Sequence, residues 1–197
     1  MKALLALAQA IDAANDLFAV LAKWAVGAAC FISAGNALVR YGFDWSSNGL
    51  LEVQWYLFAF CVMLGAPQVL RLNEHVRVDV LYTLYPSRGK VWFDLLGLAL
   101  FLLPMTLLVM TLSWPLLADQ FHSGERSSNA GGLIRWPVYA LVPLGFTLLL
   151  LQGVSEFIKR IGFLMGRAPD PGVKQQAKSA EEELADVIRA RSDGAAK

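Results

Sequence analysis

The chain has 197 residues, of which 56% are hydrophobic and only 17% are charged, and its formal net charge is +1. A mean hydropathy of +0.49 argues against a soluble domain, and the nearly neutral charge gives no support to nucleic-acid binding. The two cysteines, Cys30 and Cys61, lie inside apolar runs and imply neither a disulfide framework nor a metal site.

Four long apolar runs cover residues 18–39, 50–70, 91–117 and 136–158. A bilayer core about 30 Å thick needs about 20 apolar residues per helix, and each run is that long. Backbone groups in lipid must be bonded within the segment, and the alternation typical of barrel strands is missing. The sequence therefore predicts an all-α integral membrane protein, with four transmembrane helices in a membrane domain over 18–160.

Basic residues are unequally divided between the two sides that four spans define. Of the 17, only Arg40, Arg126 and Arg135 lie beyond the outer ends of the spans, and 14 lie on the opposite side. The positive-inside rule therefore places both termini in the cytoplasm.

The segments that flank the four spans are expected to lie at the inner membrane surface or beyond it. The apolar stretch within 1–17 is too short for a signal peptide, so we expect an amphipathic interfacial helix there. Residues 161–197 contain the breaker RAPDPG and then turn polar, which predicts a mobile cytoplasmic tail.

The first span carries small residues at every fourth position: Ala25, Ala29, Ser33 and Ala37. On a helix this spacing forms a ridge that lets another helix approach closely, either within the chain or in a partner. The alternative interpretation is that alanine is simply common in this span.

The second span begins close to an ionisable residue, Glu52. A carboxylate near the interface costs less than one in the bilayer centre, so we expect it to bond an arginine or an amide of another segment. A role in an ion path is the alternative.

The third span and the loop that follows it contain helix breakers. Pro104 is expected to kink the span, with neighbouring groups bonding the freed carbonyl. The loop DQFHSGERSSNAGG is polar and rich in turn formers, which predicts that it is mobile or is shaped by whatever binds it.

Between the second and third spans, His75, Arg77 and Asp79 occupy alternate positions. We expect this block to fix the turn between the spans, and it could also contact a partner. Arg77 is a poor neighbour for a cation, and His75 and His122 fall on opposite sides of the membrane. The sequence thus predicts no metal, no haem, no other cofactor in this chain and no catalytic site.

The motif set resembles the small membrane subunit, or DctQ type, of tripartite ATP-independent periplasmic (TRAP) transporters. The resemblance rests on Glu52, Gly65, the block Glu74-His75-Val76-Arg77-Val78-Asp79 and the stretch from Trp136 to Phe146. It covers roughly residues 15–160 and is loosest in the outer loop.

This resemblance implies a multi-pass protein of the bacterial inner membrane that is not an enzyme. It implies a fixed scaffold, surrounded by lipid, that pairs with a large elevator-type membrane subunit. That partner would hold the substrate and sodium sites for uptake of an organic acid, which a periplasmic binding protein delivers. Contacts with the binding protein would involve Asp44, Trp45, Glu125, Arg126 and Arg135.

Two other functions remain open at the level of the sequence. One is an independent small channel or exporter that uses Glu52 as its ionisable group. The other is a membrane enzyme or a haem or quinone subunit. The span centres carry few polar residues, which favours the scaffold.

Overall fold

The computed structural model describes residues 1–45, 47–73 and 86–169. These residues form α1 (Lys2–Phe43), α2 (Asn48–Arg71), α4 (Ser87–Gly97), the π-helical turn η1 (Leu98–Leu102), α5 (Leu103–Ser123) and α6 (Trp136–Leu164). Because α4, η1 and α5 follow one another without a gap, they form one membrane span. The four predicted transmembrane helices are confirmed, since four helical stretches of the described residues are long and apolar enough to cross a membrane.

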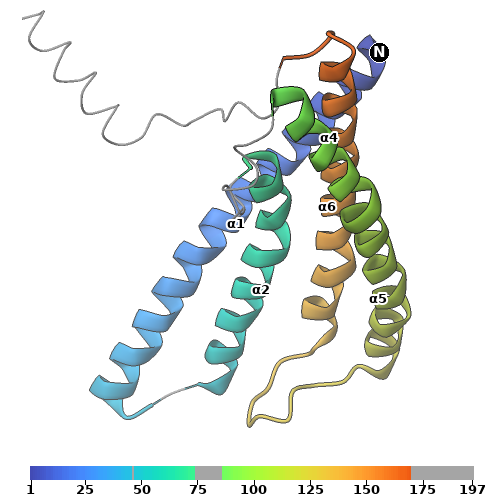
Figure 1. Ribbon diagram of the computed structural model, residues 1–197. Coiled ribbons are helices and arrows are strands. Elements are labelled where there is room, and N and C mark those ends of the chain that lie inside the picture. Colours follow the sequence, from blue (N-terminus) through green and yellow to red (C-terminus); the bar gives the residue numbers. More distant parts are fainter. Residues whose placement is uncertain (46, 74–85, 170–197) are drawn as a thin grey trace, which may run out of the picture.

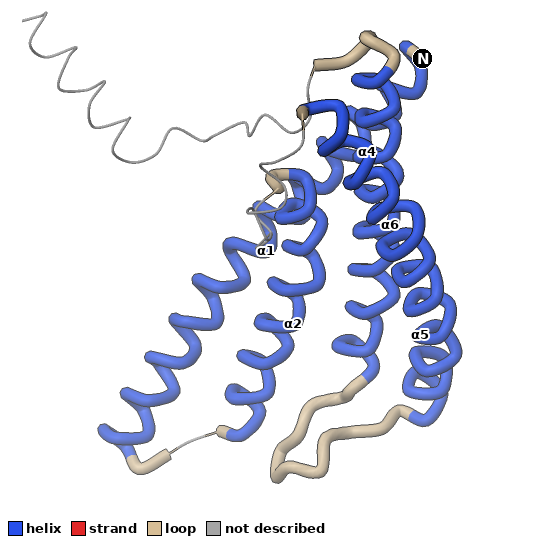
Figure 2. Tube along the Cα trace, viewed as in Figure 1, coloured by secondary structure: helices blue, strands red, loops and turns tan. Residues whose placement is uncertain are grey.

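The helices lie in the order α1, α2, α6, α5 across the molecule (Figures 1 and 2). One end holds the start of α1, the end of α2, the start of α4 and the end of α6, and we call it the network end. The opposite end holds the α1–α2 connection and the loop between α5 and α6, and we call it the loop end. The start of α1 and the end of α6 thus share one end, as the predicted topology requires. That this end faces the cytoplasm stays a prediction.

The first helix is much longer than a span. Its 42 residues correspond to about 63 Å at 1.5 Å per residue, about twice the thickness of the bilayer core. The predicted segment 1–17 is helical, but it continues into the first span without a break. Its position at the membrane surface stays a prediction.

Two glycines of α6 mark the points where its neighbours come closest. A Cβ atom on Gly145 would lie 2.7 Å from the Cβ atom and 2.8 Å from the carbonyl oxygen of Met63 on α2. A Cβ atom on Gly153 would lie 2.6 Å from a methyl group of Leu102. Small residues permit such crossings, and they matter in lipid because no hydrophobic force drives helices together there.

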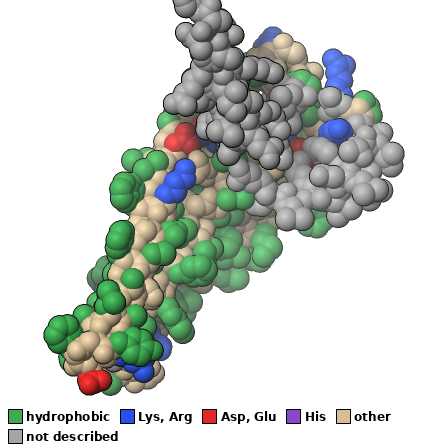
Figure 3. Space-filling model, turned by 90° about the vertical axis from the view of Figure 1, so that its left-hand side faces the viewer, with side chains coloured by type: hydrophobic (Ala, Val, Ile, Leu, Met, Phe, Trp, Pro, Cys, Tyr) green, Lys and Arg blue, Asp and Glu red, His purple; other side chains and the backbone are tan. Residues whose placement is uncertain are grey.

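The outside of the molecule is strongly apolar. Trp24, Phe31 and Trp55 are 75%, 82% and 78% exposed. Figure 3 views the molecule from the side of α1, and hydrophobic side chains run along the visible arm while charged ones lie mainly near its ends. This surface suits lipid chains or an apolar partner.

The predicted ridge of small residues is only partly covered by the chain's own helices. Ala25 is buried and Ala29 half-buried, whereas Ser33 and Ala37 are exposed. The half near the network end therefore packs within the chain. Contact of the outer half with a partner helix stays a prediction.

The third span is interrupted just before Pro104. The backbone N–H of Leu103 donates to the carbonyl of Leu98, five residues back, which is the hydrogen bond of a π-helical turn. In a regular helix the ring of Pro104 would crowd the carbonyl of Leu100 four residues earlier. One turn later, the Thr106 hydroxyl donates to the carbonyl of Leu102 at 2.8 Å.

Adding a methyl group at the two helix crossings should have unequal effects. Gly145→Ala should lower stability by about 1–3 kcal/mol, because the backbone of α2 must move away. Gly153→Ala should cost less, because the crowded atoms belong to flexible leucine side chains. Thermal unfolding of the purified chain in detergent would measure both.

Gly35→Ala is the matched control, since nothing lies within 4 Å of a Cβ atom there. It should be neutral or slightly stabilising, because alanine favours a helix over glycine. Equal losses of stability for Gly35→Ala and Gly145→Ala would contradict a close crossing of α2 and α6 at Gly145.

Candidate functional site

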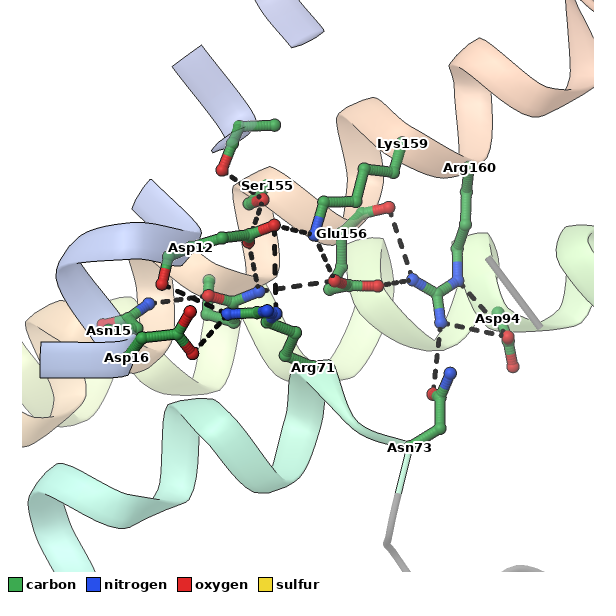
Figure 4. Close-up of polar contacts among 12 residues, drawn as sticks. Asp12, Asn15, Asp16, Arg71, Asn73, Asp94, Ser155, Glu156, Lys159 and Arg160 are labelled. Carbon is green, nitrogen blue, oxygen red and sulfur yellow. Dashed lines mark hydrogen bonds and ion pairs between the residues drawn. The ribbon is translucent and has the colours of Figure 1, made fainter. Parts of the chain in front are cut away.

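Polar side chains from four helices meet at the network end and form what we call the polar network (Figure 4). Its members are Asp12, Asn15 and Asp16 on α1, Arg71 and Asn73 at the end of α2, Asp94 on α4, and Gln152, Ser155, Glu156, Lys159 and Arg160 on α6.

Asp12 fastens α1 to α6. Its Oδ1 atom accepts hydrogen bonds from Ser155 Oγ at 2.9 Å and Gln152 Nε2 at 3.0 Å, and its Oδ2 atom lies 2.6 Å from Lys159 Nζ. One turn further along α1, Asn15 Nδ2 donates to Gln152 Oε1 at 2.6 Å. Three polar side chains of α6 are thereby bonded to α1.

Arg160 joins α6 to two other helices. Its side chain is only 2% exposed and forms an ion pair with Glu156 on its own helix. Its Nε and Nη2 atoms lie 3.3 and 3.2 Å from Asp94 Oδ2 on α4. Nη2 also reaches Asn73 Oδ1, just past α2, at 3.5 Å. One guanidinium thus connects α2, α4 and α6.

The third cation, Arg71, connects α2 to α1. It forms an ion pair with Asp16 and donates from Nη1 to the carbonyl of Asp12 at 3.3 Å. The network contains four carboxylates and three cations, and every carboxylate contacts at least one cation. Buried charges are tolerated when paired in this way. The geometry is that of a brace between helices, not of an open ligand site.

A second polar cluster lies at the loop end, where Glu52 holds the loop between α5 and α6. Its two carboxylate oxygens accept hydrogen bonds from Asn129 Nδ2 at 2.8 Å and from the backbone N–H of Leu133 at 2.7 Å. One turn along α2, the Tyr56 hydroxyl donates to the carbonyl of Ile134 at 3.0 Å. We call these five residues the Glu52 clamp.

The clamped loop depends on two adjacent glycines. Gly131 adopts a φ of +73°, a conformation that other residues rarely take. A Cβ atom on Gly132 would lie 2.6 Å from the carbonyl oxygen of Ser127. The loop that was expected to be mobile or shaped by a binder is therefore shaped by the chain's own second span.

The residues expected to contact a binding protein lie at the same end as the clamp. Asp44 and Trp45 are exposed in the α1–α2 connection, and Arg126 is exposed in the clamped loop. Glu125 and Arg135 are paired with each other, with 2.6 Å between Oε1 and Nη1. The structure thus places these five residues at one end, but it does not test the contact.

Some predicted positions cannot be compared with the structure. His75, Arg77 and Asp79 lie outside the described residues, and so does the tail from residue 170. Among the residues that are described, no group of three or more His, Cys, Asp or Glu side chains could hold a metal ion.

The polar network is the feature that the sequence analysis missed as a site. The signal was present on α6, where Gln152, Ser155, Glu156 and Lys159 recur three or four residues apart and so share one helix face. Asp12 and Asp16 show the same spacing on α1. Ionisable residues on one face of an apolar helix predict partners on another helix, but not which ones.

Comparison with known proteins identifies the class of this helical membrane protein. The family model described as "Tripartite ATP-independent periplasmic transporters, DctQ component" matches residues 29–162. The match covers more than half of the chain, so the chain belongs to the DctQ component family of TRAP transporters. This is a family of transporter components and not of enzymes. Together with the four apolar helices, it makes the chain a multi-pass protein of the inner membrane.

A curated relative is similar over much of its length. The chain is 27% identical over 151 residues to the C4-dicarboxylate TRAP transporter small permease protein DctQ of Vibrio cholerae serotype O1. The aligned part makes up 64% of this chain and 63% of that relative. No solved structure shows a significant match. The family match begins at residue 29, so the α1 residues of the polar network precede it.

Removing the cation at the centre of the polar network should destabilise the chain strongly. Arg160→Met should lower the free energy of unfolding by about 3–5 kcal/mol, because it leaves the buried Glu156 without its guanidinium partner and removes the ion pair with Asp94. Thermal unfolding in detergent would measure the loss. Arg167→Met is the control, because Arg167 is exposed just beyond α6. Similar unfolding temperatures for the two variants would argue against the network as a brace.

Glu52→Gln should loosen the loop at the other end without unfolding the helices. The glutamine keeps one acceptor oxygen, but its NH₂ group faces a donor whose hydrogen bond the carboxylate had accepted. We expect faster amide exchange at Leu133 and faster tryptic cleavage after Arg126. Asp119→Asn, at an exposed carboxylate of α5, should change neither rate. Unaltered exchange at Leu133 would rule out the clamp.

Proposed function

We propose that this chain is the small subunit of a TRAP-type transporter and serves as a fixed scaffold for a large membrane subunit. That partner would contain the substrate and sodium sites and would move against the scaffold. A periplasmic binding protein would deliver an organic acid to the complex. The family membership supports this assignment, and the name of the Vibrio cholerae relative, which specifies C4-dicarboxylates, supports a carboxylate as the substrate.

The pairing of the buried charges is the observation that carries the proposal. A carrier that acts alone needs ionisable groups free to bind its cargo between the helices. In the part of the chain that the structure describes, the buried Glu156 and Arg160 are bonded to each other, and both carboxylate oxygens of Glu52 are taken up by the loop. Thr106, Ser113 and Thr147 donate to carbonyls of their own helices.

Two surfaces of the chain are proposed as contacts. The loop end, with Asp44, Trp45, Glu125, Arg126 and Arg135, would meet the binding protein. The block of His75, Arg77 and Asp79 would fix the turn between the second and third spans and contact the large subunit. The exposed apolar sides of α1 and α5 are then available to lipid and to the large subunit.

Purification of a tagged chain together with a co-expressed large TRAP subunit would test the proposal. We expect the two chains to elute as a heterodimer and to take up a carboxylate in liposomes only when sodium and the binding protein are present. If the tagged chain always elutes without the large subunit and transports solute alone, the scaffold function is wrong.

Glu52→Gln separates the scaffold from the alternative, an independent channel or exporter that uses this carboxylate. In a scaffold, the substitution should leave the heterodimer intact and affect the step in which the binding protein docks. In an independent carrier, it should abolish transport at every concentration of binding protein. Uptake measured at several concentrations of binding protein distinguishes the two.

A further inference from the structure

The third span is attached to α6 at two points, one before the π-helical turn η1 and one at its end. Before the turn, Asp94 on α4 lies 3.2 Å from Arg160 Nη2. At its end, Leu102, the last residue of η1, and Leu103, the next residue, both pack on Gly153, where a Cβ atom would lie 2.6 and 3.0 Å from their methyl groups. Both attachments require the same side of the third span to face α6.

A regular helix would not allow both attachments. Leu102 follows Asp94 by eight residues, and a helix of 3.6 residues per turn rotates by about 100° per residue. Eight such steps leave Asp94 and Leu102 about 80° apart around the axis, and nine steps leave Asp94 and Leu103 about 180° apart. One face of a helix is about 100° wide, so Leu103 would then point away from α6.

The π-helical turn removes this mismatch, because it takes up one more residue per turn than an α-helix does. Leu102 then follows Asp94 by about seven regular steps and Leu103 by about eight, so the three side chains lie within about 100° of one another. The hydrogen bond from the Leu103 N–H to the Leu98 carbonyl closes this turn at the second attachment.

We propose that η1 is a register device: it absorbs one extra residue in the third span so that Asp94 stays on Arg160 while Leu102 stays on Gly153. Pro104 favours the turn at this place, because it cannot donate the next backbone hydrogen bond and crowds a regular helix. Asp94 is thereby a positioning residue, which holds α4 against α6 through the Arg160 guanidinium. The inference concerns this chain alone and does not depend on its partner.

Deletion of Ala99, inside η1, tests the proposal. The shortened span should become a regular helix with both attachments in phase, so the full chain in detergent should unfold within a few degrees of the parent. The control is deletion of Leu107, an exposed residue in the regular helix α5. It puts the two ends of α5 out of phase and should lower Tm much further. Equal losses for the two deletions, or failure of the Ala99 deletion to fold, would overturn the proposal.

Asp94→Asn gives the second readout, which a general loss of stability would not reproduce. In the parent it should lower Tm by several degrees, because Arg160 loses one of its two carboxylate partners. In the Ala99 deletion it should lower Tm by the same amount, because Asp94 still faces Arg160. A drop that vanishes in the deletion background, or that is missing in the parent, would contradict the assigned register.

Discussion

A buried guanidinium between two carboxylates, Arg160 with Glu156 and Asp94, is the interaction on which the network end depends. Burying a charge in an apolar body costs several kcal/mol unless a partner offsets the cost. The partners of Arg160 lie on different elements, so satisfying the charge also joins α6 to α4. In lipid, where apolar contact alone does not drive helices together, such ties and the close crossings at Gly145 and Gly153 hold the bundle.

The polar groups are concentrated at the two ends, and each end is held differently. At the network end, side chains bond to side chains across four helices. At the loop end, the Glu52 carboxylate bonds to the loop between α5 and α6. In the apolar body between them, the hydroxyls of Thr106 and Thr147 bond to carbonyls of their own helices. Asn36 Oδ1 and Gln54 Nε2, by contrast, are buried without a hydrogen-bond partner among the described residues. This arrangement suits a chain that keeps its shape while a partner moves.

Several parts of this structure were predictable because they depend on local properties. The four spans follow from the lengths of the apolar runs, and the disturbance near Pro104 follows from its missing N–H. Glu52 could be recognised as a carboxylate in need of a donor. Its actual partners, an asparagine side chain 77 residues away and a backbone amide 81 residues away, could not be predicted from its neighbours in the sequence. The polar network was missed for the same reason, since Asp12 and Gln152 are 140 residues apart.

The sequence by itself determined the membrane class, the number of spans and the helical form of each, because hydropathy and backbone bonding in lipid act within a single segment. It also carried the motif that resembles the DctQ family. Only the tertiary structure decided that the first helix runs on to bond α6, which charges pair, and how the third span stays in phase with Arg160. Those choices depend on the distance and orientation of side chains on different helices, which exist only once the helices have packed.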